Sequence, residues 1–493
     1  MIYLNKYLIP LLMPLMAVLN TLEAQACPAL IRDLDAIVNQ PQFHTAQFGI
    51  SIQTQSRNSS ILYSHNADRL LIPASNAKLL TTAAAVQALP LDFTVKTTLY
   101  DVGNNQFYLV GEGDPTFKTT HLQSLAQSLA QSLKDHNIKQ IKKLTLDDRY
   151  YGAEWLNPRW GWDDVQADYA PPINGLILNE NAIGLTLTPG IVGQPLVVKW
   201  NEAENSKQYR VENLTKTVAI DQPEFVNIAQ PEPGLVRVTG QLRIGAEPES
   251  VGISVQQPTK YFAEQFRRSL STFGIEIETL EIISTSNSLM SPLTCGVACP
   301  KGVGARGIVA QITSPPLSQW IHETNQTSNN LYAETLLRQL GRSDSLPMGT
   351  GYSSDRGLIV LRQQLMNTGI APETYQMVDG SGLARLNWVS AGTLAQVLQA
   401  MAENSTFRKS LPIAGQSGSL AERFKNTPAQ SILSAKTGFL TGAIGLSGYV
   451  NPKKFSPIVF SILLNNSTEP LSEQRKAVDA IAIRLANLRD CKL

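Results

Sequence analysis

The sequence contains few charged residues and no excess of either sign. Asp, Glu, Lys and Arg make up 16% of its 493 residues, against about 25% in an average soluble protein. There are 41 basic and 40 acidic residues, which gives a net charge of +1. Because nucleic-acid binding needs a concentrated basic face, the composition argues against a nucleic-acid partner.

Long hydrophobic runs are absent except at the N-terminus. Lys6 precedes an apolar stretch from Tyr7 to Leu19, and Ala24-Gln25-Ala26 follows it. A basic flank, an apolar core and a small-residue site are typical of a secretory signal peptide. The alternative, an uncleaved anchor helix, needs about 20 apolar residues. We therefore expect cleavage of residues 1–26, export to the periplasm and at most peripheral membrane contact.

Cysteine is also scarce, with four residues in the whole chain. An even number in an oxidising compartment favours disulfides, for which three pairings are possible. We prefer Cys27–Cys491, which would join the ends of the mature chain, together with the short loop Cys295–Cys299. A zinc site at the second pair is the alternative, but a second ligand pair is missing and the five histidines form no metal-binding pattern. We expect no metal and no other cofactor.

Both ends of the mature chain carry helix and strand patterns. Apolar residues recur at helical spacing near the start, and two strand-like runs precede an amphipathic helix near the end. The predicted elements are a helix at 29–38, strands at 48–53, 61–63, 444–450 and 457–464, and a helix at 473–488. We expect the two ends, residues 27–95 and 290–493, to form one α/β domain.

The middle of the chain, residues 96–289, has a different pattern. Short alternating runs are separated by turns rich in Pro, Gly and Asn, and one helix is predicted at 261–273. A structureless linker of this length is not credible. We expect a strand-rich insertion that forms one or two small domains.

Ser75 and Lys78 lie in a segment that is almost wholly small or apolar. On a helix, residues three apart share a face, so the lysine amine can reach the hydroxyl. Serine becomes a good nucleophile when a base removes its proton. Burial lowers the pKa of a lysine toward neutrality, which makes Lys78 a candidate base. A Ser-x-x-Lys pair also occurs by chance, so it is weak evidence alone.

A second motif, Ser328-Asn329-Asn330, stands at the start of a predicted helix. The Ser328 hydroxyl and the Asn330 amide can both project into one cleft. Ser328 alone also fits a simple N-cap.

A third motif, Lys436-Thr437-Gly438, follows a strand-like run. Lys436 and Thr437 offer a cation and a hydroxyl that can hold a substrate carboxylate. Gly438 lets a substrate backbone approach closely for strand-like pairing.

In this order, the three motifs resemble those of the penicillin-binding proteins and serine β-lactamases. The stretch between Ser75 and Ser328 is far longer than a compact β-lactamase domain allows. It resembles the class C type-4 penicillin-binding proteins, the DacB-like D-alanyl-D-alanine carboxypeptidases and endopeptidases of peptidase family S13. Further matches are Gly111-Glu112-Gly113-Asp114-Pro115, Asp379-Gly380-Ser381-Gly382-Leu383-Ala384-Arg385 and Leu411-Pro412-Ile413-Ala414-Gly415. The resemblance implies a transpeptidase-like antiparallel sheet with helices on both faces.

The resemblance also implies a role for each motif. Ser75 would attack the D-Ala-D-Ala carbonyl to form an acyl-enzyme, Lys78 would be the base, and Ser328 would relay a proton to the leaving amine. The substrate would be bound by Asn330, Lys436, Thr437, Gly438 and Arg385. The backbone N–H groups of Ser75 and Phe439 would form the oxyanion hole, with each donor worth about 3–4 kcal/mol.

Two positions need comment. The family usually has Ser or Thr after Lys-Thr-Gly, whereas this chain has Phe439, whose ring can alter specificity or slow β-lactam acylation. Arg385 fits a contact with the free carboxylate of a meso-diaminopimelate side chain, and a surface salt bridge is the alternative.

We therefore expect a serine D-Ala-D-Ala carboxypeptidase, and also a D,D-endopeptidase, that acts on peptidoglycan stem peptides and is acylated by β-lactams. One alternative is a β-lactamase, although the sequence has no obvious Glu-x-x-x-Asn element to activate water. The other is a non-catalytic peptidoglycan-binding or penicillin-sensing protein, which the intact motifs oppose. The sequence leaves the oligomeric state open.

Overall fold

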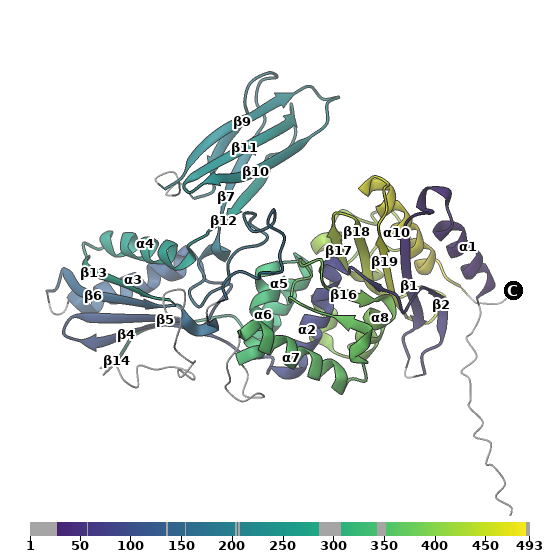
Figure 1. Cartoon of the computed structure of the whole chain (residues 1–493), viewed down its shortest axis with the longest axis horizontal. Coiled ribbons are helices and arrows are strands. Elements are labelled where there is room, and N and C mark those ends of the chain that lie inside the picture. The colour runs from purple at the N-terminus through teal and green to yellow at the C-terminus, as the bar shows by residue number, and fades with distance from the viewer. Residues whose placement is uncertain are drawn as a thin grey trace, which may run out of the picture.

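A computed structural model of the chain describes residues 27–489 apart from 57, 135–136, 153, 203–204, 206–207, 285–306 and 343–351. Its main parts are an α/β body built around one sheet, and a second group of sheets formed by the middle of the chain (Figure 1). Residues 1–26 and the cysteines at 295, 299 and 491 lie outside the described residues.

The central sheet of the body is made from both ends of the chain. Its strand order is β17-β18-β19-β1-β2, and every neighbouring pair is antiparallel. The bounds are β1 (Gln47–Thr54), β2 (Ile61–His65), β17 (Leu433–Leu440), β18 (Ala443–Val450) and β19 (Ile458–Asn465). The N-terminal strands therefore cannot complete this sheet without the C-terminal ones.

Strand β19 shows why both faces of this sheet are covered. Side chains alternate between the faces of a strand, and Val459 and Leu463 pack into one hydrophobic core while Phe460 and Ile462 pack into another. All four are fully buried, and such burial is worth about 2 kcal/mol for each side chain. The predicted antiparallel sheet with helices on both faces is confirmed.

Two helices cover one face, and a larger helical group covers the other. On the first face lie α1 (Pro28–Val38) and α10 (Leu471–Ala486), which also contact each other. On the second lie α2 (Ala77–Ala88), α5 (Leu317–Gln326), α6 (Asn330–Arg342), α7 (Ser353–Asn367), α8 (Ala391–Ala400) and α9 (Ser405–Ser410). A small sheet in the order β15-β16-β3 joins β3 (Leu70–Leu71), β15 (Tyr375–Gln376) and β16 (Trp388–Ser390).

The largest sheet outside the body has the order β13-β6-β5-β4-β14. Its bounds are β4 (Lys96–Gly103), β5 (Gln106–Gly111), β6 (Gln140–Asp147), β13 (Glu276–Ile283) and β14 (Gly307–Thr313). The helices α3 (Thr119–Lys134) and α4 (Pro258–Ser271) pack into its core. The sequence analysis predicted α4 and missed α3.

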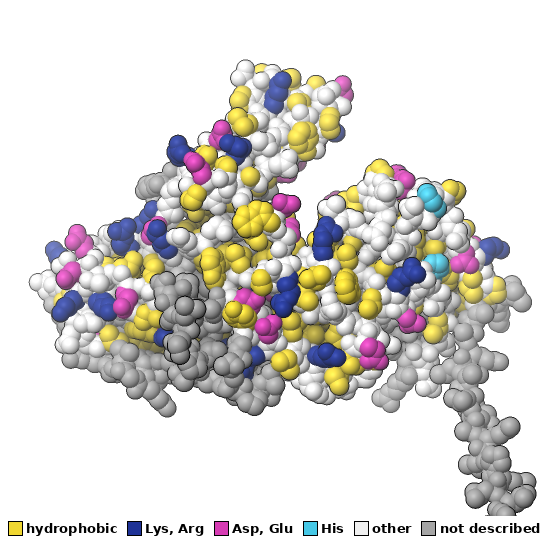
Figure 2. Space-filling model, viewed as in Figure 1, with side chains coloured by type: hydrophobic (Ala, Val, Ile, Leu, Met, Phe, Trp, Pro, Cys, Tyr) yellow, Lys and Arg dark blue, Asp and Glu magenta, His cyan; other side chains and the backbone are white. Residues whose placement is uncertain are grey.

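Two smaller sheets complete the middle of the chain and rise above the rest in Figure 1. One has the order β12-β7-β8 and the other β10-β11-β9. Their bounds are β7 (Ala182–Thr188), β8 (Val197–Trp200), β9 (Arg210–Val218), β10 (Phe225–Glu232), β11 (Leu235–Arg243) and β12 (Glu249–Ser254). On the face drawn in Figure 2, basic and acidic side chains are interspersed along the molecule.

Candidate active site

Ser75 lies in a short 3-10 turn, η2 (Ala74–Asn76), that leads directly into α2. Ala74 has φ +48°, a left-handed conformation that is unfavourable for a residue with a Cβ atom. Because α2 is buried on nearly every side, the turn is held between the helical group and the sheet. Ser75 itself is only half-buried, so its hydroxyl is open to a substrate.

Lys78 is fully buried one turn later and lies close to Ser75. Its Nζ is 3.0 Å from Oγ of Ser75, 2.6 Å from Oδ1 of Asn330 and 2.6 Å from the carbonyl oxygen of Ser381. Burial lowers the pKa of Lys78 to about 7, against the opposing effect of Asp379 and Glu334. A large fraction of these amines is therefore uncharged near neutral pH, with a lone pair that can accept the Ser75 proton.

Lys436 is a second fully buried lysine at the same place. Its Nζ donates to Oγ of Ser328 at 2.7 Å and to the carbonyl oxygen of Thr437 at 2.9 Å. Burial, with a smaller contribution from the charge of Lys78, lowers the pKa of Lys436 well below its usual range. The charge of Lys78 therefore disfavours protonation of Lys436.

Ser328 lies in the loop between α5 and α6, with φ +65°. The helix is capped by Asn329 instead, whose Oδ1 accepts from the backbone N–H of Tyr332 at 3.2 Å. The simple N-cap interpretation of Ser328 is therefore wrong, because the hydroxyl is held by Lys436. Asn330 connects two parts of the chain, since its Oδ1 faces Lys78 and its Nδ2 donates to the carbonyl oxygen of Tyr169 at 2.8 Å.

Strand β17, at the edge of the central sheet, carries the third motif. A Cβ atom at Gly438 would stand 2.6 Å from Nδ2 of Asn76 and 2.7 Å from the carbonyl oxygen of Pro73. Glycine therefore lets the strand lie directly against the Ser75 turn. Oγ1 of Thr437 lies 2.8 Å from Oγ of Ser419, and the Phe439 ring is 56% exposed.

Sequence reasoning gave no role to the loop that places the Ser381 carbonyl on Lys78. Oε1 of the buried Glu334 accepts the N–H groups of Gly380 and Ser381 at 2.8 and 2.9 Å. Asp379 accepts those of Gly382 and Ala384, both at 2.7 Å. The signal that could have found this loop is the run Asp379 to Arg385, which the sequence analysis noted only as a family match.

Glu334 has an unusual electrostatic environment. Burial, reinforced by the nearby Asp379, raises the pKa of Glu334 to about 8. Its other oxygen, Oε2, is buried and has no hydrogen-bond partner among the described residues. Near neutral pH this carboxyl is therefore mostly protonated, which limits its effect on Lys78.

Arg385 contacts the turn that follows β17. It is exposed, and its Nη1 donates to the carbonyl oxygen of Thr441 at 2.9 Å. Within the described part of the chain it forms no salt bridge. Its guanidinium is therefore solvent-exposed and lies next to the backbone just beyond the end of β17.

The described residues contain no group of three or more His, Cys, Asp and Glu side chains suited to a metal ion, and no helix among them has the length and hydrophobicity to span a bilayer. A cavity of about 440 Å³ is separate from the three motifs and is lined by Thr116, Ser318, Gln319, His322, Glu323 and Tyr332.

Known proteins are similar in sequence to this chain along most of its length. The chain is 29% identical over 487 residues to a D-alanyl-D-alanine carboxypeptidase of Actinomadura sp. (strain R39), which covers 93% of this chain and 84% of the relative. It is 25% identical over 445 residues to D-alanyl-D-alanine carboxypeptidase DacB of Haemophilus influenzae, covering 85% of each.

The fold is similar to that of a solved protein. The crystal structure of penicillin binding protein 4 (dacB) from Haemophilus influenzae matches with a TM-score of 0.72 at 21% identity, covering 92% of this chain and 98% of that one. A family model described as D-Ala-D-Ala carboxypeptidase 3 (S13) matches residues 30–487. The family expected from the three motifs is therefore confirmed, and the chain belongs to the D-Ala-D-Ala carboxypeptidase 3 (S13) family.

Proposed function

We propose that this chain removes the terminal D-alanine from peptidoglycan stem peptides through an acyl-enzyme on Ser75. The observation that carries the proposal is the 3.0 Å contact between Nζ of a fully buried Lys78 and Oγ of Ser75. Together with membership of the S13 family, this contact supports a serine-type D-Ala-D-Ala carboxypeptidase.

Acylation begins with proton transfer from Ser75 to the uncharged amine of Lys78. Oγ of Ser75 then attacks the carbonyl carbon of the penultimate D-alanine. The resulting oxyanion accepts hydrogen bonds from the backbone N–H groups of Ser75 and Phe439. Two such donors are worth several kcal/mol in the transition state (about 3 kcal/mol each). The proton that Lys78 took from Ser75 then passes by way of Ser328 to the leaving nitrogen as the C–N bond breaks, and free D-alanine departs.

Substrate binding uses residues of the second and third motifs. Lys436 and Thr437 hold the terminal carboxylate, and Asn330 binds the peptide amide. Burial disfavours the charged form of Lys436. The negative charge of a bound carboxylate stabilises that charged form. The edge position of β17 supports strand-like pairing with the substrate backbone. Water then hydrolyses the ester.

The same site fits two related activities. A D-Ala–diaminopimelate cross-link presents the same carbonyl, so endopeptidase cleavage follows the same steps, and in this proposal the exposed Arg385 contacts a diaminopimelate carboxylate. A β-lactam presents a strained amide and a carboxylate in the same relation, and it leaves a stable ester on Ser75.

Incubation of the purified mature protein with muropeptides, followed by mass spectrometry, tests the proposal. We expect loss of one alanine from pentapeptide stems, and neither this loss nor labelling by a fluorescent penicillin in Ser75→Ala. Labelling retained in Ser75→Ala would contradict the nucleophile assignment. Rapid hydrolysis of penicillin would instead indicate a β-lactamase, and binding of muropeptides without cleavage would indicate a sensing protein.

The chain organisation is part of the proposal. We propose a penicillin-binding domain formed from 27–95 and the C-terminal part, interrupted by the insertion. Strand β14 pairs with β4 of the inserted sheet, which supports a second boundary near residue 314 in place of 290.

We also propose export by a cleaved signal peptide. The proposed substrate, peptidoglycan, lies in the cell wall, and this location supports export.

The pairing of Cys27 with Cys491 is supported by two observations. Cys27 is disulfide-bonded, and α1, which follows it, contacts α10, which precedes Cys491.

A further inference from the structure

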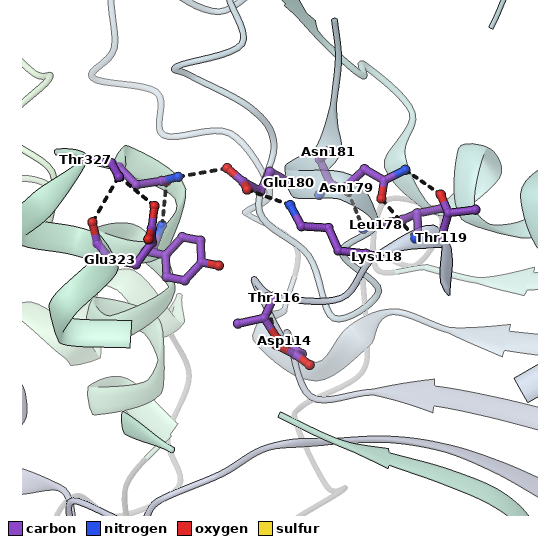
Figure 3. A network of polar contacts seen from close by, with 12 residues as sticks. Asp114, Thr116, Lys118, Thr119, Leu178, Asn179, Glu180, Asn181, Glu323 and Thr327 are labelled. Carbon is purple, nitrogen blue, oxygen red and sulfur yellow. Dashed lines mark hydrogen bonds and ion pairs between the residues drawn. The ribbon is translucent and has the colours of Figure 1, made fainter. Parts of the chain in front are cut away.

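The inserted region contacts the Ser328–Asn330 motif at two points. Tyr169 accepts a hydrogen bond from Asn330 through its carbonyl oxygen. Glu180 reaches the residue between Ser328 and Asn330, since its Oε2 accepts from Nδ2 of Asn329 at 2.8 Å. Figure 3 shows the Glu180 carboxylate between Lys118 on one side and the loop containing Thr327 on the other.

Glu180 is held in an unfavourable backbone conformation. Asn179, Glu180 and Asn181 have φ values of +49°, +59° and +51°. Left-handed residues with a Cβ atom normally occur singly, and Asn tolerates the conformation better than Glu because its short amide bonds to nearby backbone. Three in a row therefore store strain, and most of it falls on the central glutamate.

The two asparagines use their amides on backbone N–H groups. Oδ1 of Asn181 accepts from the N–H of Leu178 at 3.1 Å, within the turn, and Oδ1 of Asn179 accepts from that of Thr119 at 3.0 Å, outside it. Glu180 makes no such local bond. Its carboxylate instead forms an ion pair with Lys118 at 2.7 Å and accepts a hydrogen bond from Asn329. The strain at this position is therefore matched by a contact with the motif and not by a contact within the turn.

Asn329 is fixed at both ends of its amide. Its Oδ1 caps α6 through the N–H of Tyr332, so its Nδ2 must face the Glu180 carboxylate. Ser328, on one side, is left-handed and bonded to Lys436, and Asn330, on the other, is bonded to Lys78. A shift of Asn329 would therefore move both neighbouring side chains away from the two lysines.

We propose that Glu180 is a positioning residue of the active site. Through Asn329 it sets the position of Ser328 and Asn330, and Lys118 orients its carboxylate for this contact. The inserted region thus takes part in acylation at Ser75 without touching the substrate through this residue. This inference rests on the proposed function of the three motifs.

The test uses two substitutions in the full mature chain. Glu180→Gly removes the carboxylate and relieves the left-handed strain, so we expect an unchanged or higher melting temperature together with a roughly tenfold lower rate constant for acylation by a fluorescent penicillin. Glu180→Gln keeps an acceptor for Asn329, so we expect it to recover most of that rate. Asn137→Gly, at an exposed left-handed position (φ +54°), is the control and leaves the rate unchanged.

Each outcome has a defined meaning. If the wild-type protein is not labelled, the proposed function fails, and the role of Glu180 fails with it. If the wild type is labelled and Glu180→Gly is labelled at the same rate, the positioning role alone is overturned. In an Asn329→Ala background Glu180→Gly should have no further effect on the rate, and a second full loss would overturn the assignment of Asn329 as the link. A lower melting temperature in Glu180→Gly would overturn the strain argument, and the recovery in Glu180→Gln would still decide the positioning role.

Discussion

Lys78 and Lys436 are two fully buried lysines that each contact one serine hydroxyl, Ser75 at 3.0 Å and Ser328 at 2.7 Å. Burying two cations together is costly unless one or both lose a proton. Burial is therefore what makes an uncharged amine available beside Ser75.

The rate of acylation should depend on pH through Lys78. Its pKa is about 7 and the uncharged amine is the base, so the rate constant for penicillin acylation should rise about tenfold per pH unit below 7 and level off above it. A stopped-flow or quenched labelling series from pH 5 to 9 measures this (the range spans about two units on each side of the pKa). A rate independent of pH would argue against Lys78 as the base.

Lys78 should also make the stability of the fold depend on pH. The unfolded chain keeps this proton up to about pH 10.5, whereas the folded protein loses it near 7. The unfolded state therefore binds more protons in that window, and the contribution of Lys78 to the free energy of unfolding rises with pH from about 7 to 10.5. Urea titrations of the wild type and Lys78→Met across this window would show a difference that shrinks as pH rises, and a constant difference would contradict the shift.

Glu334→Ala should damage both stability and activity. It leaves the N–H groups of Gly380 and Ser381 without their buried acceptor, which should cost about 2–3 kcal/mol of unfolding free energy and loosen the carbonyl that holds Lys78. Denaturant unfolding and penicillin labelling measure the two effects.

The conservative Glu334→Gln variant separates position from charge. It keeps the acceptor for the two N–H groups. Because the Glu334 carboxyl has a pKa of about 8 and is already mostly uncharged where Lys78 titrates, the acid limb of the acylation profile should keep its position and the plateau should stay within about threefold of wild type. A limb that moved to lower pH would contradict the protonated state of Glu334.

Gly438→Ala should separate β17 from the Ser75 turn. The new Cβ would meet Asn76 and Pro73 at less than ordinary contact distance, so we expect acylation to fall by at least about tenfold, because small displacements of reacting groups are costly. Gly307→Ala, in β14 with open space around the new Cβ, is the control and should be labelled normally.

Phe439→Ser should raise reactivity toward β-lactams with little change in stability. The ring is 56% exposed, so its loss removes little packing, and the cleft edge becomes wider and gains a hydroxyl. We expect acylation to become several-fold faster, within about 1 kcal/mol. Phe439→Ala distinguishes the two causes, since an equal gain would assign the effect to the ring alone.

The sequence predicted the central sheet because its strands are long, apolar and flanked by amphipathic helices. It missed α3, whose buried face is Leu122, Leu125, Ala126, Leu129 and Leu133, because Ser, Gln and Thr fill the rest of the helix and weaken the apolar pattern. The missed helix packs into the core of the inserted sheet, and that tertiary contact stabilises what local preference leaves weak.

The sequence predicted those residues of the candidate site that belong to short motifs with recognisable chemistry. Ser75, Lys78, Ser328, Asn330 and Lys436 are brought together as the motifs implied. The supporting residues Glu334 and Ser381 were not assigned roles, because one acts through an ordinary buried carboxylate and the other through a backbone carbonyl. Neither has a sequence signal that distinguishes it from a structural residue.

The pairing of β1 with β19, and the contact of β17 with the Ser75 turn, have a consequence for biosynthesis. The nucleophile is translated before the inserted region, whereas the strand carrying Lys436 and the partner of β1 are translated after it. A nascent chain therefore holds Ser75 without the second amine or a closed sheet, and it stays inert toward peptides and antibiotics until β17 and β19 have joined the strands made before the insertion.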